Sequence, residues 1–149
     1  MLSTIHTNSA SGAIPRFLSM GVKPFLLAPA LNSIIGQRLV RKVCSQCIEE
    51  DKLAEDKMPK IKEILEKLPE AEKKNINLSD LRFYKGRGCE HCGGLGYKGR
   101  VGIYEIFVMN KTIEDNILSG QVSEYVIQDL AIKDGMVTMA QDGLLKALD

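Results

Sequence analysis

Apolar residues in the first part of the chain recur at the spacing of a helix. Ile14, Phe17 and Leu18 lie on one helical face and are followed by Gly21, a residue type that commonly ends helices. The apolar residues among positions 1–5 instead indicate the end of a short strand. We therefore expect a strand, a polar turn and a short helix at the start of the chain.

A second helix is predicted to begin near Pro24, because the fixed φ of proline suits a first helical turn. Its apolar residues continue as far as Ile35, with a kink expected at Pro29, where one backbone hydrogen bond is lost. Residues 38–43 then alternate toward Cys44, as an extended segment would.

The last third of the chain predicts one strand followed by helices. Residues 101–108 are rich in β-branched and aromatic side chains, and a glycine-rich turn at residues 93–100 precedes them. Helices are expected over residues 112–118, 123–133 and 138–148, with Gly120 and Gly135 as stops.

Residues 49–74 differ from the rest, since most of them are Lys, Glu or Asp. Within this stretch an apolar stripe recurs at helical spacing, formed by Ile61, Ile64, Leu65 and Leu68. Acidic and basic residues are nearly balanced, which favours a solvated surface helix over a membrane-binding or calmodulin-binding helix. We expect an insertion over residues 49–75 that carries one small amphipathic helix.

Composition narrows the class of protein without identifying it. A chain of 149 residues fits one compact domain or the tail of a larger one. The net charge of +1 indicates no general attraction to nucleic acid. No apolar run reaches the roughly 20 residues of a membrane span, and the N-terminus does not resemble a signal peptide. We therefore expect no transmembrane segment, no nucleic-acid partner and thiols that stay reduced.

The strongest chemical signal is a set of four cysteines in two Cys-x-x-Cys pairs, Cys44 with Cys47 and Cys89 with Cys92. Two such turns can complete a tetrahedron of thiolates around one Zn²⁺ ion. Because a four-thiolate site leaves no open position for water or substrate, the expected role is structural. An iron–sulfur cluster or unmetallated thiols remain alternatives, and His91 is expected to point to solvent instead of replacing a cysteine.

Other motifs fit the sequence less well. Residues 94–99 satisfy G-x-G-x-x-G, but a strand-like segment follows where a dinucleotide site needs a helix. No G-x-x-x-x-G-K-[ST] motif occurs, so we expect no ATP hydrolysis by this chain alone. Residues 89–96 match one repeat of the zinc domain of DnaJ-type chaperones, although no further repeat exists. The basic residues of a nucleic-acid-binding ribbon are also few, namely Arg82, Lys85, Arg87, Lys98 and Arg100.

A series of short motifs occurs in order along the chain, namely residues 2–8 (LSTIHTN), 12–18 (GAIPRFL), 20–22 (MGV), 24–28 (PFLLA), 37–41 (QRLVR), 88–92 (GCEHC), 96–105 (GYKGRVGIYE), 134–136 (DGM) and 142–144 (DGL). This series resembles the C-terminal part of the type II secretion and type IV pilus assembly ATPases. The motifs cover nearly the whole chain except the charged insertion.

This resemblance implies a hexameric ring of RecA-like ATPase cores that binds ATP and Mg²⁺ and drives pilin or pseudopilin movement. The implied location is the cytoplasmic face of the inner membrane, with the membrane platform and other secretion or pilus assembly proteins as partners. The tetracysteine element of assembly-type members binds zinc, and His6 matches the family's histidine box near the terminal phosphate of the nucleotide. The P-loop and Walker B segments of the family precede that box.

We therefore predict an α+β fragment of a RecA-like core, with a tetracysteine zinc element and a helical C-terminal tail. Residues 1–43 are assigned to the end of the ATPase core, residues 44–99 to the metal-binding element and residues 100–149 to a strand and a helical segment. We expect a truncated open reading frame or an excised fragment, inactive by itself. The alternative is a freestanding zinc-binding interaction module, either chaperone-like or a nucleic-acid-binding ribbon.

Overall fold

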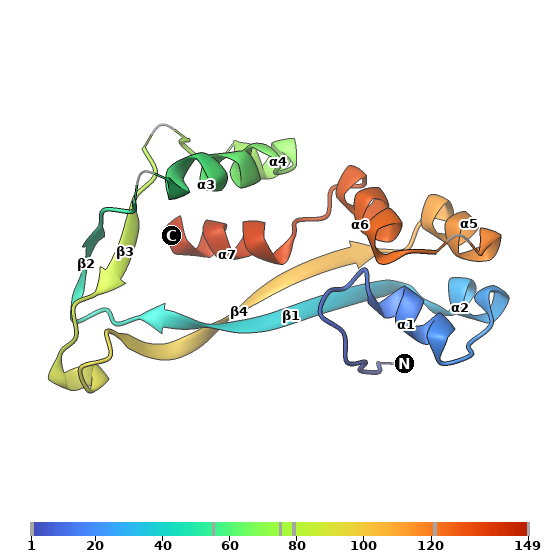
Figure 1. Cartoon of the computed structure of the whole chain (residues 1–149), viewed down its shortest axis with the longest axis horizontal. Coiled ribbons are helices and arrows are strands. Elements are labelled where there is room, and N and C mark those ends of the chain that lie inside the picture. Colours follow the sequence, from blue (N-terminus) through green and yellow to red (C-terminus); the bar gives the residue numbers. More distant parts are fainter. Residues whose placement is uncertain (1, 55, 75, 79, 121, 149) are drawn as a thin grey trace. The chain divides into compact units, whose positions relative to one another are not determined.

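The computed structural model describes residues 2–54, 56–74, 76–78, 80–120 and 122–148. The chain forms two compact units, each assembled from two separate stretches of sequence. The first unit contains Met1–Gln37 and Tyr104–Thr138, and the second contains Arg38–Ile103 and Met139–Asp149. Helices and strands are mixed throughout, so the expected α+β character is confirmed (Figure 1).

The first unit is built on four helices around one hydrophobic core. They are α1 (Ala13–Ser19), α2 (Pro24–Ala30), α5 (Lys111–Ser119) and α6 (Glu124–Lys133). The core consists of Ala10, Ile14, Leu27, Ala28, Phe107, Ile113, Ile117, Ile127, Ala131 and Met136. Burial of these apolar side chains is the main source of stability of this unit.

Two long strands, β1 (Ser33–Val43) and β4 (Tyr97–Val108), pair in a two-stranded sheet and run in opposite directions (Figure 1). In the first unit, β4 places Glu105 and Phe107 on its buried face, whereas Ile106 and Val108 are exposed. This alternation is the period-2 pattern of a strand with one face on a core.

The second unit contains the short antiparallel pair β2 (Ile48–Asp51) and β3 (Phe83–Gly86), in which Ile48 lies opposite Gly86 and Asp51 opposite Phe83. It also contains α3 (Lys57–Glu66), α4 (Glu70–Lys73), the 3-10 turn η1 (Glu90–Cys92) and α7 (Met139–Leu148).

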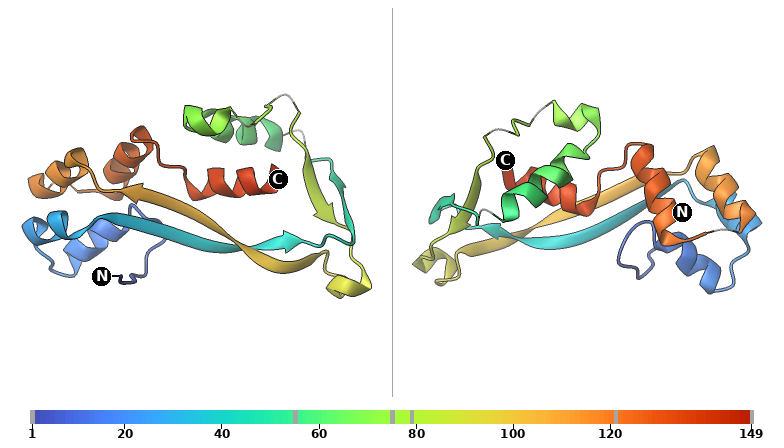
Figure 2. Two further views of the ribbon diagram at one scale, coloured as in Figure 1. Left: turned by 180° about the vertical axis from the view of Figure 1, so that it is seen from behind. Right: turned by 45° about the horizontal axis from the view of Figure 1, so that its top comes forward.

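Helix α3 of the charged insertion packs against α7, and the two lie side by side in both views of Figure 2. Leu65 and Leu68 of the predicted apolar stripe are buried. The side chain of the buried Gln141 donates a hydrogen bond of 3.2 Å to the carbonyl of Ile64. The predicted amphipathic helix is therefore confirmed, and its apolar face is covered within this chain.

Two predictions about the first part of the chain are wrong. Residues 2–7 form no regular element, and Met1 lies outside the described residues. An apolar segment becomes a strand only beside a partner strand, and none pairs with residues 2–7 in the described part of the chain. The second helix ends at Ala30 instead of continuing through Ile35, because residues 33–43 pair with β4. Pro29 therefore lies in the last turn of α2 and not at a mid-helix kink.

The remaining helices of the sequence prediction are confirmed as α1, α5, α6 and α7, and the predicted strands are confirmed within β1 and β4. Strands β2 and β3 were not predicted. Two parts of the sequence prediction stay predictions. One is the origin of these elements in a RecA-like core, and the other is the division of the chain into residues 1–43, 44–99 and 100–149. In the described part of the chain, no helix is both long enough and apolar enough to span a membrane.

Candidate metal centre

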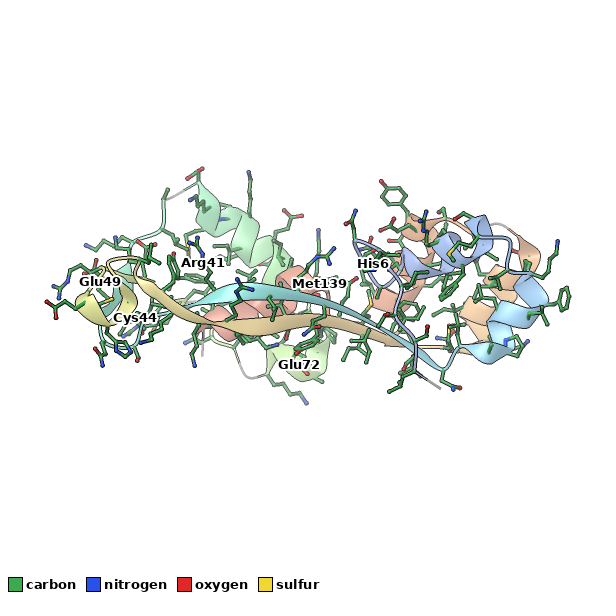
Figure 3. All side chains as sticks on the ribbon, turned by 90° about the horizontal axis from the view of Figure 1, so that it is seen from below. His6, Arg41, Cys44, Glu49, Glu72 and Met139 are labelled. Carbon is green, nitrogen blue, oxygen red and sulfur yellow. The ribbon has the colours of Figure 1, made fainter. Side chains whose placement is uncertain are left out.

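Two tight turns of the second unit bring the four cysteines together. Cys44 follows the last residue of β1, where Figure 3 labels it, and its turn is closed by a hydrogen bond of 3.2 Å from the Cys47 N–H to the Cys44 carbonyl. The other turn is η1, in which the Cys92 N–H donates to the Cys89 carbonyl at 3.2 Å. In each turn the Cys-x-x-Cys spacing directs both side chains to the same side.

The sulfur atoms are arranged as one ion would require. All four lie within 4.8 Å of one another. The Cys44 and Cys89 sulfurs are 3.9 Å apart, as are those of Cys47 and Cys92, and 3.7 Å separates the sulfurs of Cys89 and Cys92. A tetrahedron with metal–sulfur bonds of about 2.3 Å has sulfur–sulfur edges of about 3.8 Å. The residues therefore fit a single tetrahedral metal ion.

The backbone around Cys92 favours its thiolate form. The N–H groups of Cys89 and Gly96 each lie 3.2 Å from the Cys92 sulfur. Hydrogen bonds to the charged form, that from Cys89 first, lower the pKa of the Cys92 thiol to about 6. Burial has the opposite effect on Cys47 and raises the pKa of its thiol to about 12. Near neutral pH these pKa values favour the thiolate of Cys92 and the neutral thiol of Cys47.

Glycines allow the two loops that carry the site to approach each other. A Cβ atom added to Gly86 would lie 1.9 Å from the carbonyl oxygen of Gly96, and one added to Gly96 would lie 2.3 Å from that of Gly86. Gly96 also has a φ of +76°, which a side chain would strain. The Cys44 N–H donates to the Gly96 carbonyl at 3.0 Å, so the backbones themselves join the turns. The glycine-rich segment therefore has a structural purpose and does not form a dinucleotide site.

Positively charged and aromatic residues lie close to the cysteines in sequence and contact one another or His91. Lys98 donates to the carbonyl of His91 at 3.0 Å, and its ammonium lies 3.4 Å from His91 Nδ1. The guanidinium of Arg41 lies 4.4 Å from the centroid of the Tyr97 ring, a cation–π distance. His91 is exposed and does not belong to the group of metal-ligating atoms. Among the described residues, the four cysteines therefore form a group that could hold a metal ion, and His91 is not part of it.

The sequence matches the family described as type II/IV secretion system protein over residues 1–149. The chain belongs to this family. Among its relatives, the type IV pilus assembly ATPase PilB of Thermus thermophilus is 42% identical over 148 residues, which cover 99% of this chain and 15% of that protein. PilB of Pseudomonas aeruginosa is 38% identical, with 99% of this chain and 24% of that protein covered. Type II secretion system protein E of Dickeya dadantii is 35% identical, with 99% and 26% covered.

The chain thus spans between 15% and 26% of the length of these three members of the secretion protein family. The resemblance inferred from the short motifs is confirmed, because the matched relatives are the pilus assembly ATPases and the secretion proteins that the motifs indicated.

His6, the other predicted site residue, lies in the first unit, outside the cysteine cluster. It is part of the irregular segment before α1, and its side chain is exposed (Figure 3). Sequence reasoning did not identify the residues that hold this segment, which include Glu105 of β4. The only sequence signal at Glu105 is its acidic side chain within residues 101–108, where no other charged residue occurs.

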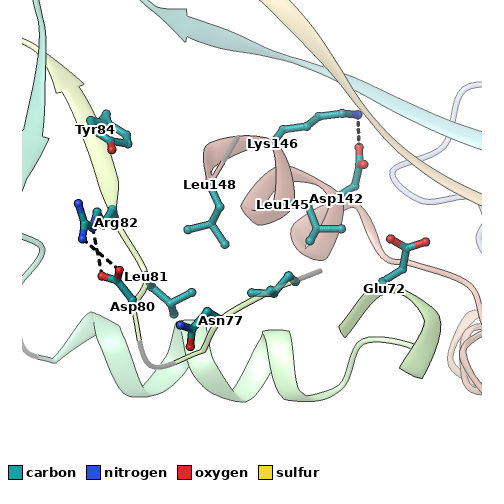
Figure 4. A pocket seen from close by; sticks show the side chains of 11 residues that line it. Glu72, Asn77, Asp80, Leu81, Arg82, Tyr84, Asp142, Leu145, Lys146 and Leu148 are labelled. Carbon is teal, nitrogen blue, oxygen red and sulfur yellow. Dashed lines mark hydrogen bonds and ion pairs between the residues drawn. The ribbon is translucent and has the colours of Figure 1, made fainter. Parts of the chain in front are cut away.

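A pocket of about 540 Å³ also lies in the second unit, between α7 and the segment that leads into β3 (Figure 4). Its charged side chains include two ion pairs, Arg82 with Asp80 at 3.1 Å and Lys146 with Asp142 at 2.6 Å. Each pair is neutral as a unit, so together the pairs create no field that would attract a charged ligand. We assign no ligand to this pocket.

Proposed function

We propose that this chain is the C-terminal segment of an ATPase motor that powers type IV pilus assembly or type II protein secretion, and that its cysteines bind structural zinc. The observation that carries the proposal is the cluster of four sulfurs, spaced for one tetrahedral ion, in a chain of the secretion protein family. The relatives are named as ATPases of pilus assembly and as secretion proteins.

Zinc is favoured over the other metals by the donor set. Four thiolates and no open coordination position are typical of structural zinc sites. In an iron–sulfur cluster the cysteines bind different iron atoms, so their sulfurs are spread more widely than around one ion. The measured edges of 3.7 and 3.9 Å support a single ion. Such an ion would hold the turn after β1 against the turn before β4 and would take no part in chemistry.

The longer protein of this proposal is one that contains the present chain as its C-terminal segment. In it, ATP and Mg²⁺ would be bound by the parts of a RecA-like core that carry the P-loop, and this chain would supply His6 near the terminal phosphate. A ring of six such subunits at the cytoplasmic face of the inner membrane would act on the membrane platform and the other assembly or secretion proteins. The 149 residues alone contain no P-loop motif and are expected to hydrolyse no ATP.

Metal content tests the proposal directly. Protein purified without added metal should contain about one zinc per chain by elemental analysis, with four thiols protected from a thiol reagent until a chelator is added. Cys44→Ser should lose the zinc, whereas Ser45→Ala, an exposed position in the same turn, should keep it.

The longer protein provides the second half of the test. It should hydrolyse ATP, and the 149-residue chain should not. Iron in place of zinc, or four freely reactive thiols in the untreated protein, would reject the structural zinc site. ATP hydrolysis by the 149-residue chain would reject its assignment as a segment without the phosphate-binding machinery.

A further inference from the structure

The segment after His6 is an ordered turn, although it contains no helix or strand. The Thr7 hydroxyl donates to the carbonyl of Ser9 at 2.8 Å, and the Gly12 N–H donates to the Ser9 hydroxyl at 3.0 Å. Ala10 and Ser11 are each only 1% exposed. These contacts fix the backbone between His6 and α1, so the histidine is attached to a rigid support.

The innermost contact of this turn is made by a carboxylate from a distant part of the chain. The Ala10 N–H donates to Glu105 Oε1 at 2.5 Å, across 95 positions of sequence. Glu105 is only 5% exposed and lies on the buried face of β4, beside Phe107. An apolar residue here would leave the Ala10 N–H without this buried acceptor, which is costly. A charged acceptor forms a stronger bond than a neutral one.

A second carboxylate reaches the outer side of the same turn. The Ser9 hydroxyl donates to Glu124 Oε1 at 2.5 Å, and Glu124 is the first residue of α6. Gly12 leaves room for this contact, since an added Cβ atom would lie 3.1 Å from the Ser9 hydroxyl and 3.4 Å from the Glu124 carboxylate. Strand β4 and helix α6 thus each contribute one acidic side chain to a turn that begins next to His6.

We propose that Glu105, assisted by Glu124, is a positioning residue that fixes the turn of residues 7–12 and thereby the direction of the His6 side chain toward the nucleotide phosphates of the longer protein. This inference rests on the proposed role of His6. Glu105 itself need not touch the nucleotide. A reacting group must be held close to its productive position, and a displacement of about 1 Å can reduce the rate roughly a hundredfold.

The turn itself is tested by amide hydrogen exchange on the 149-residue chain. Glu105→Ala should speed exchange in residues 7–12 and leave α2 protected, while Glu105→Gln should preserve the protection, because its amide oxygen can accept the Ala10 N–H. Glu124→Ala removes the contact with the Ser9 hydroxyl but leaves the Gly12 N–H bonded to that hydroxyl, and it should have a smaller effect in the same residues. Unchanged exchange in residues 7–12 of both alanine variants would overturn the proposal.

The link to His6 is tested by a double-mutant cycle in the longer protein. Glu105→Ala and His6→Ala should each lower kcat about ten- to a hundredfold with little change in the KM for ATP, and the double variant should be no worse than His6→Ala. Phe107→Leu, a core substitution on the same strand, serves as the control for lost stability and should lower Tm without affecting kcat. Losses that multiply in the double variant would overturn the positioning role. Absence of ATP turnover in the unmodified longer protein would instead reject the proposed function.

Discussion

At the scale of single residues, the thiols of the metal centre differ in how readily they ionise. Two backbone N–H groups hold the pKa of Cys92 at about 6, whereas burial raises the pKa of Cys47 to about 12. In the metal-free chain the Cys92 thiolate stabilises the fold above the ordinary thiol value of 9.0, and this contribution is lost as the pH falls through about 6. The fold favours the neutral form of the Cys47 thiol, so the contribution of this thiol to stability is fully present below 9.0 and is lost as the pH rises toward 12.

This difference predicts the number of protons released when zinc binds. At about pH 7.5 Cys92 is already ionised, whereas Cys47 must give up its proton to become a ligand. The unmodified chain should therefore release about one proton fewer at pH 7.5 than at pH 5, where Cys92 is protonated as well. Calorimetric titration in buffers with different ionisation enthalpies measures this number. The same number of released protons at both pH values would contradict the assignment of Cys92 as the ionised thiol.

The residues of the site divide into those that the sequence reveals and those that only the fold reveals. The approach of four sulfurs, those of Cys44, Cys47, Cys89 and Cys92, could be predicted because two Cys-x-x-Cys turns suit one metal ion. The hydrogen bond from the Gly96 N–H to the Cys92 sulfur could not be predicted, because it depends on how the glycine-rich loop folds back toward the cysteines. For the same reason the contact between Glu105 and the Ala10 N–H could not be predicted from the sequence.

At the scale of elements, the last residue of β3 lies very close to Gly96, the residue before β4. Gly86 lies where any side chain would collide with the Gly96 backbone, with a Cβ-to-oxygen distance of only 1.9 Å. Gly86→Ala should therefore push the loops apart and destabilise the protein by about 1–3 kcal/mol, with weaker zinc binding.

Gly99→Ala is a suitable control for that substitution. Gly99 has a φ of +80° but open space around its Cα, so alanine there costs only backbone strain, about 1–2 kcal/mol, and should leave zinc affinity unchanged. Thermal unfolding and a competition titration with a zinc chelator separate the two effects. Equal zinc affinities for the two variants would show that the close approach does not shape the site.

The elements that could be predicted are those with local signals. Helices α5 and α6 begin at Asn110 and Ser123, whose side chains accept hydrogen bonds from the helix N-termini, and α5 ends at Gly120 with a φ of +76°. Strand β2 carries no such signal, because three of its four residues are acidic. It forms because β3 pairs with it and places Lys85 opposite Glu49, with the ammonium 3.2 Å from Asp51.

At the scale of the whole molecule, the two compact units are stabilised by different means. The first unit has a continuous apolar core, in which Ile14, Ile113, Ile117 and Ile127 are fully buried. In the second unit the cysteines themselves form a buried cluster, to which no other hydrophobic side chain of the described residues is assigned. Metal binding would thus replace apolar packing around the turns, as in small metal-stabilised domains.

Removal of the metal should therefore affect the two units unequally. Structural zinc contributes about 10–16 kcal/mol of apparent binding free energy, comparable to the total stability of a typical domain. A chelator should abolish the amide protection of residues 86–97 and leave α5 and α6 protected, because the core of the first unit contains no metal ligand. Hydrogen exchange with mass spectrometry, with and without chelator, measures both regions in one sample.

Two variants serve as controls for the chelator. Without chelator, Cys44→Ser should show the same loss of amide protection in residues 86–97 as the chelated protein, and Ser45→Ala should keep that protection. Equal loss of protection in α5 and in residues 86–97 would mean that the two units unfold as one, and that the metal stabilises the whole chain.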